Sequence, residues 1–245
     1  MKQSITLAIV FLIFVMAPPV MSQTITNFSD WTLLVCPQNE DCKTESGGSG
    51  GTVTIRGGDW SSSLSIDNGK LTFDVDGSKD QWLWVGLFKN FGSQASIIIT
   101  SATIQDISGN AYAGIWHSIE EWPIQGVQDD EMTCEVRLID WDNSRSLDWK
   151  VRERSDDRSY EKILSRGFFG EFSGEWDVGQ TKFLGYGMFI NQMYFWIDGY
   201  KSIHSFMPMV SFSSSQAEFD PALEVFVDKG DSNHINVDFN HVTVQ

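Results

Sequence analysis

The chain has 245 residues, and its 17 lysines and arginines against 33 aspartates and glutamates give a formal net charge of −16 at pH 7. Such an acidic surface repels the phosphates of nucleic acid and anionic lipid. This charge argues against a nucleic-acid-binding protein. It also disfavours a strongly anionic polysaccharide as ligand, unless metal ions or a local basic patch intervene.

The first residues have the pattern of a secretory signal peptide. Lys2 precedes an apolar run over residues 5–17, and Val20-Met21-Ser22 offers small or apolar residues where a signal peptidase cuts. The run is too short to cross a bilayer, and no later apolar stretch approaches membrane length. We therefore expect a signal peptide over 1–22, a single β domain over 23–245, no membrane insertion, and a secreted location (extracellular, periplasmic or cell surface).

The three cysteines divide into a close pair and a single residue. Cys36 and Cys42 lie six residues apart around Pro37, Asn39 and Asp41, so a small disulfide-closed loop is expected in an exported protein. Cys134 shares one face of an alternating stretch with Met132, Val136 and Leu138. A buried, inert thiol is the natural interpretation of that position.

Most of the chain alternates between apolar and polar residues with period two, which is typical of half-buried strands. The residues that share one face of each predicted strand are, in chain order: Leu71, Phe73 and Val75; Leu83 and Val85, with Trp82 and Trp84 on the other face; the run Ile97–Ile99; Ala111, Ala113 and Ile115, with Tyr112, Gly114 and Trp116 on the other face; Leu147, Trp149 and Val151; Met193, Phe195 and Ile197; Leu223, Val225 and Val227; and Ile235, Val237 and Phe239.

Other segments break this pattern. The glycine-rich residues 43–51 predict a flexible loop, and residues 156–165 predict a short helix or an irregular loop. Asp198-Gly199 predicts a tight turn. His241 falls where the alternation of the last strand is interrupted, which predicts a bulge. About a dozen short strands with tight turns predict an all-β, two-sheet antiparallel jelly-roll β-sandwich.

Three stretches resemble the concanavalin A-like lectin/glucanase superfamily, in the form of a LamG-like jelly roll. They are residues 101–105 leading into Ala113-Gly114-Ile115, the aromatic-rich hairpin strand 193–197 ending in Asp198-Gly199, and the closing strand 236–244. The resemblance implies two stacked antiparallel sheets, one of them concave. In many members that concave face holds a carbohydrate, so the resemblance also implies a glycan or polysaccharide as partner.

A glycosidase needs two carboxyl groups flanking the scissile bond, and glucanases of this superfamily carry them as Glu-x-Asp-x-Glu on one strand. The chain lacks that spacing. The alternating set Asp129, Glu131, Thr133 and Glu135 has threonine at the position of the central acid, and a second near-match, 171–177, contains glycine. No catalytic residue is therefore assigned from the sequence.

Sugars stack on aromatic rings, while polar side chains bond their hydroxyls. Alternation places one set of rings and charges opposite the aliphatic set, and we predict that this outward set lines one carbohydrate-binding face: Tyr112, Trp116, Glu135, Arg137, Tyr194 and Trp196. The alternative is that other segments cover these residues as a second small core.

No cofactor is assigned with certainty. A structural calcium ion remains open because residues 74–77 and 228–233 are rich in aspartate, asparagine and glycine, although such clusters are usually turns. The leading interpretation is a secreted carbohydrate-binding or surface-adhesion sandwich without evident catalytic machinery. The alternatives are an extracellular polysaccharide hydrolase or lyase and a structural envelope or matrix module.

Overall fold

The computed structural model describes residues 22–92, 95–119, 130–142, 144–155, 161–168, 176–189, 192–198, 200–205 and 219–245. This part of the chain contains no α-helix. Its strands are β1 (Gln23–Thr24), β2 (Thr32–Pro37), β3 (Lys43–Ser46), β4 (Gly51–Gly57), β5 (Trp60–Asp67), β6 (Lys70–Asp76), β7 (Leu83–Phe88), β8 (Ile97–Ser108), β9 (Ala111–Ile119), β10 (Asp130–Trp141), β11 (Ser144–Ser155), β12 (Glu161–Phe168), β13 (Thr181–Phe189), β14 (Gln192–Ile197), β15 (Tyr200–Ser205), β16 (Ala222–Val227) and β17 (His234–Val244).

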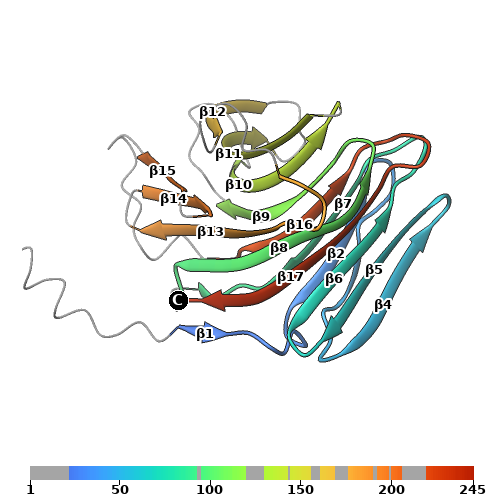
Figure 1. The fold of residues 1–245 in the computed structure, drawn as a ribbon, viewed down its shortest axis with the longest axis horizontal. Helices are drawn as coiled ribbons and strands as arrows, with labels where there is room; N and C mark the ends of the chain where they lie inside the picture. Colours follow the sequence, from blue (N-terminus) through green and yellow to red (C-terminus); the bar gives the residue numbers. More distant parts are fainter. Residues whose placement is uncertain are drawn as a thin grey trace, which may run out of the picture.

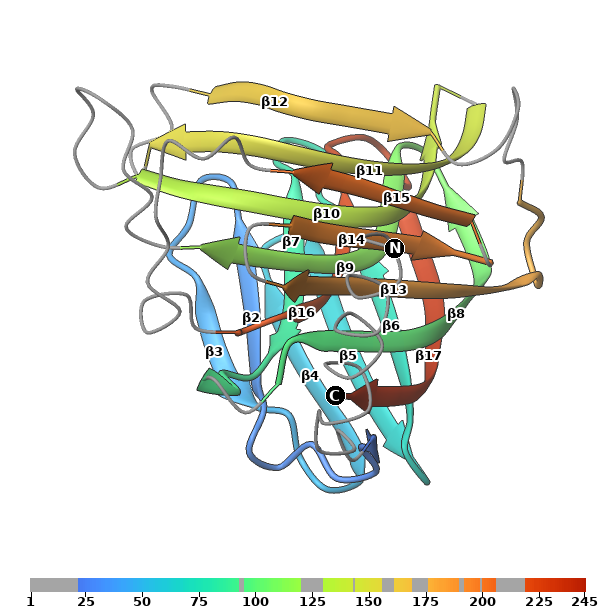
Figure 2. The ribbon, with the colours of Figure 1, turned by 90° about the vertical axis from the view of Figure 1, so that its left-hand side faces the viewer.

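The strands form two antiparallel sheets. The nine-stranded sheet has the order β15-β14-β13-β8-β17-β6-β5-β4, with β1 paired to β17, and the eight-stranded sheet has the order β12-β11-β10-β9-β16-β7-β2-β3 (Figure 1). Strands β13 and β14 of one sheet lie over β9 and β10 of the other (Figure 2). The predicted all-β jelly-roll sandwich is confirmed.

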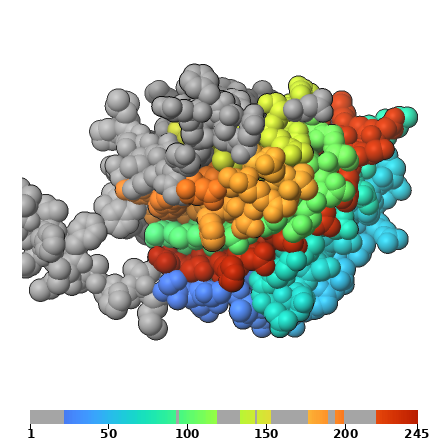
Figure 3. All heavy atoms as spheres, in the orientation of Figure 1, coloured from blue at the N-terminus to red at the C-terminus, as the bar shows by residue number. Residues whose placement is uncertain are grey.

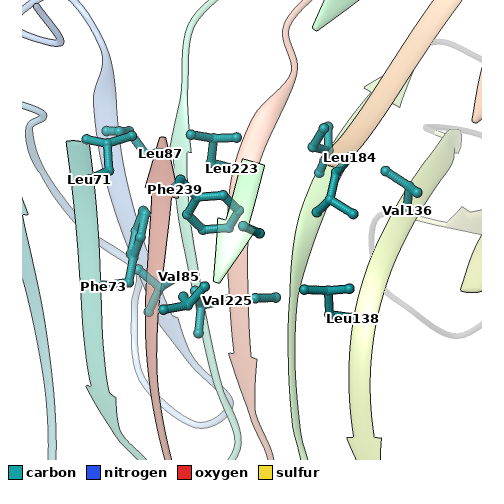
Figure 4. Packing of buried hydrophobic residues seen from close by; sticks show 14 of the residues in the cluster. Leu71, Phe73, Val85, Leu87, Val136, Leu138, Leu184, Leu223, Val225 and Phe239 are labelled. Atoms are coloured by element: carbon teal, nitrogen blue, oxygen red, sulfur yellow. The ribbon is translucent and has the colours of Figure 1, made fainter. Parts of the chain in front are cut away.

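Aliphatic and aromatic side chains from both sheets fill the space between them (Figure 4). Phe73 of β6 and Phe239 of β17 are both fully buried and meet edge to face, with ring centroids 5.7 Å apart. The predicted alternation holds here: Val85, Val136 and Val225 face this core. The residues between them, such as Trp84 and Phe226, therefore point to the opposite face of the sheet.

Two predicted segments differ from the structure. In the predicted segment 156–165, residues 161–165 belong to β12, which pairs with β11 across a register shift between Val151 and Arg152, so neither a helix nor a loop forms there. Residues 156–160 lie outside the described part of the chain. The predicted loop 43–51 is also shorter, because Lys43–Ser46 pairs with β2 as an edge strand. Lys43–Ser46 is polar, and residues 161–165 place Ile163 next to Leu164 instead of in alternation, so backbone pairing and not an alternating pattern makes both stretches strands.

Local details match the sequence. Cys36 and Cys42 form a disulfide, and Cys134 is free and buried. Asp198 has φ 47° in the β14–β15 turn, and His241 has φ 55° where the register of β17 against β8 shifts. The predicted signal peptide falls almost wholly outside the described residues. In the part of the chain that is described, no helix is long and apolar enough to cross a membrane.

Replacing Phe239 by alanine should lower the free energy of unfolding by about 3–5 kcal/mol, because a fully buried ring leaves a cavity. Phe183→Ala is the matched control: that ring is 57% exposed on the outer face of β13, and its loss should change stability by less than about 0.5 kcal/mol. Urea unfolding measures both. Equal effects would contradict this assignment of the core.

A candidate active site on the eight-stranded sheet

The outer face of the eight-stranded sheet has one row of residues with an unusual composition. Strand pairing aligns Gly86 of β7, Glu224 of β16, Gly114 of β9, Arg137 of β10 and Asp148 of β11 side by side. Glu224 therefore has a glycine on each side. These glycines leave room across the sheet that larger neighbouring side chains occupy.

Two long side chains use this room. A Cβ atom on Gly86 would lie 2.2 Å from Cη2 of Trp84, so the indole of Trp84 lies over Gly86. A Cβ atom on Gly114 would lie 2.2 Å from the carbonyl oxygen of Val136 and 3.1 Å from Cγ of Arg137. Both glycines are thus required by close packing on the outer face.

Two indoles meet over Glu224. Trp84 on β7 is paired with Phe226 and Trp116 on β9 is paired with Ala222, so the two tryptophans flank β16 on opposite sides of Glu224. Their rings are nevertheless only 5.6 Å apart, edge to face. They can reach this distance only by leaning across β16, and Glu224 has no exposed surface beneath them.

The carboxyl group of Glu224 is held by one hydrogen bond. Its Oε2 accepts from Nε1 of Trp84 at 2.8 Å, while its Oε1 has no hydrogen-bond partner among the described residues. Burial, reinforced by the negative charge of Glu135, raises the pKa of Glu224 to about 8, although the Trp84 bond acts in the opposite direction. Glu224 is therefore a neutral acid at neutral pH.

A network of ion pairs lies beside this acid. Arg137 binds Asp148 with both Nε and Nη2, at 3.0 and 2.8 Å, and its Nη1 is 2.7 Å from Oε2 of Glu135. All three side chains are almost completely buried. Burial opposes the charge of Arg137, but Glu135 and Asp148 outweigh it and raise the pKa of the guanidinium. The arginine is thus permanently charged.

Two further cations from β11 reach Glu135. Nη2 of Arg152 is 2.5 Å from its Oε1, and Nε of Arg152 donates to the hydroxyl of Thr133 at 2.9 Å. Nζ of Lys150 lies 3.6 Å from Oε2 of Glu135. Burial and the two arginines lower the pKa of Lys150, whereas Glu135 acts against this shift.

Among the described residues, the cluster has more positive than negative charge. Arg137, Lys150 and Arg152 supply three positive charges against the two of Glu135 and Asp148, and Glu224 contributes none while it is protonated. These five described side chains therefore form a locally basic cluster in a chain whose net charge is −16.

Aromatic rings continue the site toward one end of the strands. Tyr112 lies between Arg137, whose guanidinium carbon is 4.8 Å from the ring centroid, and Phe226, which stacks on it at 5.0 Å. Trp82 and Trp141 pack against Phe226 at 5.9 and 6.3 Å. Rings and charges thus occupy one continuous surface.

The structure brings together four of the six predicted binding residues. Tyr112, Trp116, Glu135 and Arg137 lie on the outer face of the eight-stranded sheet. Tyr194 and Trp196 lie on β14 of the other sheet, so the prediction of one common face is wrong for this pair. Alternation shows which side chains share a face of one strand, but it does not show to which sheet each strand belongs.

The sequence interpretation missed Glu224, Trp84, Asp148, Lys150 and Arg152 as parts of the site. Their signal was present: Glu224 alternates with the core residues Leu223 and Val225, as Asp148 does with Leu147 and Trp149. A search confined to acids at alternate positions of one strand does not find acids that lie on separate strands.

Tyr194 and Trp196 form a separate aromatic surface. Their rings stack at 5.9 Å with an interplanar angle of 14°, and both are half-buried. Trp196 lies over β13, where a Cβ atom on Gly185 would be 2.9 Å from its ring. Strands β13 and β14 reach the surface beside β8 and β17 (Figure 3).

The described residues contain no group of three or more histidine, cysteine, aspartate or glutamate side chains placed to hold a metal ion. The aspartates that suggested calcium have other contacts. Asp76 accepts from Ser61 and is 2.9 Å from Nδ1 of His234, and Asp228 accepts from the backbone of Lys229.

Comparison with solved structures identifies the fold. An alginate lyase from Klebsiella pneumoniae superposes with a TM-score of 0.53 and 10% identity, covering 89% of this chain and 96% of the lyase. A structure described under endo-acting O-glycanases of human gut microbiota has a TM-score of 0.50, 11% identity and coverage of 74% and 81%. A family GH16 endo-β-1,3(4)-glucanase has a TM-score of 0.49, 12% identity and coverage of 74% and 76%.

The fold is a two-sheet antiparallel jelly roll. These similarities, at such low identity, establish the architecture alone. No protein-family model matches the sequence, and no curated protein matches it.

The buried acid predicts a pH-dependent stability. Between the ordinary pKa of 4.5 and about 8, the folded protein keeps a proton on Glu224 that the unfolded chain has lost. Stability therefore falls as pH rises through this window, by about 1.4 kcal/mol per pH unit from this group. Glu224→Gln, which cannot ionise, should remove that slope.

Urea unfolding of both proteins across the window measures the effect, and Glu45→Gln on the exposed part of β3 is the control. The free energies of the wild type and of Glu45→Gln should change in parallel. Parallel curves for the wild type and Glu224→Gln would show that Glu224 is not protonated in the folded state.

Proposed function

We propose that the protein is an acid–base enzyme that cleaves extracellular polysaccharide, with Glu224 as the proton donor. The observation that carries the proposal is the protonated, buried carboxyl group of Glu224 with one oxygen left unpaired among the described residues. A proton donor for a glycosidic oxygen must keep its proton at working pH, and burial away from cations achieves this.

The ion-paired Glu135 supplies the second carboxylate. Strand β9 alone separates β16 from β10, so the backbones of Glu224 and Glu135 lie on the order of 10 Å apart across the sheet. Both side chains are long and lie on one face of the sheet, so the proposal places the glycosidic bond between their carboxyl groups. One group is neutral and the other is charged, as acid–base chemistry on sugars requires.

The indoles of Trp84 and Trp116 provide the surface for a sugar ring. Both are half-exposed, and they close over Glu224. A sugar that replaces the contact between them would stack on an indole and bring an oxygen next to Oε1 of Glu224. Its apolar face would bury against the ring while its hydroxyls meet the charged cluster.

Two reaction types use this arrangement. In hydrolysis, Glu224 protonates the leaving oxygen as the glycosidic bond breaks, and the negative charge of Glu135 stabilises the oxocarbenium-like transition state. Water then adds to the sugar carbon and passes a proton to Glu135. In elimination from a uronic acid, Glu135 takes the proton from the carbon next to the carboxylate, and the cations Arg137, Lys150 and Arg152 stabilise the developing anion. A ring double bond then forms as the bond to the leaving oxygen breaks and Glu224 protonates that oxygen. Polysaccharide hydrolases and lyases both occur on this fold, as the glycanase and alginate lyase above illustrate.

Glu224→Gln should lower the cleavage rate by about a hundredfold or more, because the amide cannot donate an acidic proton. The rate of the wild type should also fall above about pH 8, where Glu224 ionises. The assay uses a neutral β-glucan, an alginate and a sulfated galactan as substrates. Reducing ends without unsaturated sugars identify a hydrolase, and ultraviolet-absorbing unsaturated ends identify a lyase.

Glu45→Gln is the control and should retain the wild-type rate. Full activity of Glu224→Gln on the polysaccharide that the wild type cleaves would overturn the assignment of the acid.

Carbohydrate binding at a second surface is the second candidate function, and the stacked pair Tyr194 and Trp196 favours it. Two nearly parallel, half-exposed rings on the outer face of β14 suit the apolar faces of successive sugars. Their surface is separate from the Glu224 site because it belongs to the other sheet. The two functions can therefore be tested independently.

Replacing Tyr194 and Trp196 by alanine should weaken retention on immobilised polysaccharide by about tenfold while leaving the rate on short soluble fragments unchanged. Affinity electrophoresis and calorimetric unfolding are measured on the same samples. Unchanged retention together with lost stability would mean that the two rings only pack against the sheet.

A further inference from the structure

The described part of the chain contains two hydrogen bonds from a tryptophan indole to a glutamate, in opposite environments. Trp84 donates to the buried Glu224 at 2.8 Å, and Trp60 donates to Oε1 of the exposed Glu40 at 3.1 Å. Glu40 also accepts from Gln81, and these two donors lower its pKa. The same donor thus faces a charged carboxylate in one place and a neutral carboxylic acid in the other.

A neutral carboxylic acid has two different oxygens, a carbonyl oxygen that accepts and a hydroxyl that donates. The indole N–H is a donor only, and the carbonyl oxygen is the better acceptor for it. The bond from Trp84 to Oε2 therefore favours the form of Glu224 in which the proton is on Oε1. That oxygen has no other hydrogen-bond partner among the described residues.

We propose that Trp84 is a positioning residue that places the acidic proton of Glu224 on Oε1 and directs it to the side where the two indoles meet. The inference rests on the proposed function and adds to it which oxygen delivers the proton. It also gives a role to Gly86 of β7, because the indole of Trp84 can lie over this position, beside Glu224, only if residue 86 has no side chain.

The ring of Trp84 is fixed from several directions. It lies over Gly86, its Nε1 is bonded to Oε2 of Glu224, and its strand pairs on both sides, with β16 and with β2. A donor held this firmly keeps one orientation relative to Glu224. The carboxyl group cannot turn its hydroxyl toward Trp84 without losing the bond, since the indole offers no acceptor.

Trp84→Phe removes the N–H group and keeps most of the ring. The Trp84 bond favours the charged form of Glu224, so its loss should raise the pKa of this carboxyl by on the order of one pH unit. The alkaline limb of the pH–rate profile should move upward by the same amount. The maximal rate should fall about twofold, because the proton is then shared between both oxygens.

Gly86→Ala is a second variant that leaves both partners intact. Its methyl group would lie within 2.9 Å of three atoms of the Trp84 ring and should push the indole away from Glu224. The carboxyl titration and the alkaline limb should move in the same direction as in Trp84→Phe. This variant tests the position of the indole while its N–H group is still present.

The measurements are the carbon-13 titration of the Glu224 carboxyl, assigned by comparison with Glu224→Gln, and the pH–rate profile on the polysaccharide that the wild type cleaves. Trp60→Phe is the matched control, since it removes an indole donor from Glu40 instead, and it should move neither quantity.

The outcomes separate the two proposals. An upward shift in Trp84→Phe and Gly86→Ala, with none in Trp60→Phe, supports the positioning role. An unshifted titration in Trp84→Phe, with Glu224→Gln inactive, overturns the role of Trp84 and leaves Glu224 as the acid. Full activity of Glu224→Gln overturns both.

Discussion

The arrangement of the site depends on one constraint: the central strands of the eight-stranded sheet are buried on both faces. From Thr133 to Ile139 every side chain of β10 is buried, although only alternate residues reach the core between the sheets. Charged groups on the other face cannot rely on water. Each must be paired or must give up its charge, because an isolated buried charge costs several kcal/mol.

The outer face uses both solutions. Glu135 and Asp148 remain charged because Arg137 and Arg152 bind them directly. Glu224 lies in the same row as Arg137, but Gly114 stands between them, and within the described chain no cation forms an ion pair with Glu224. It therefore remains neutral. Two carboxyl groups with opposite protonation states thus follow from where the cations are placed.

Much of the fold could be predicted from the sequence because strand alternation is a local property. Phe73, Val136, Phe195 and Val225 were all assigned to a core face from their neighbours alone, and the structure buries each of them. The disulfide of Cys36 with Cys42 and the bulge at His241 are local as well. A residue pattern of this kind needs no knowledge of the distant chain.

The site could not be predicted to the same extent because it is assembled by the order of strands. Trp196 and Trp116 have the same local pattern, yet β14 and β9 belong to different sheets. Glu224 is brought beside Gly114 and Gly86 only by the insertion of β16 between β9 and β7. Long-range pairing of this type produces no motif of fixed spacing in the sequence. A search for acids at neighbouring positions therefore does not find this site.

Distribution of the acids over several strands has a physical consequence for the chemistry. When carboxyl groups share one strand at alternate positions, their charges act on one another directly, and each protonation state depends on the others. Here Glu224 and Glu135 are separated by β9, and each has its own environment: indoles and glycines for one, guanidinium groups for the other. Burial is then the main cause of the raised pKa of the acid, the charge of Glu135 raises it further, and the bond from Trp84 acts in the opposite direction. The cost is stability at high pH, since burial of a carboxyl group becomes less favourable as the unfolded chain ionises. A site built in this way gives up some folding free energy near neutral pH in exchange for a proton that is available there.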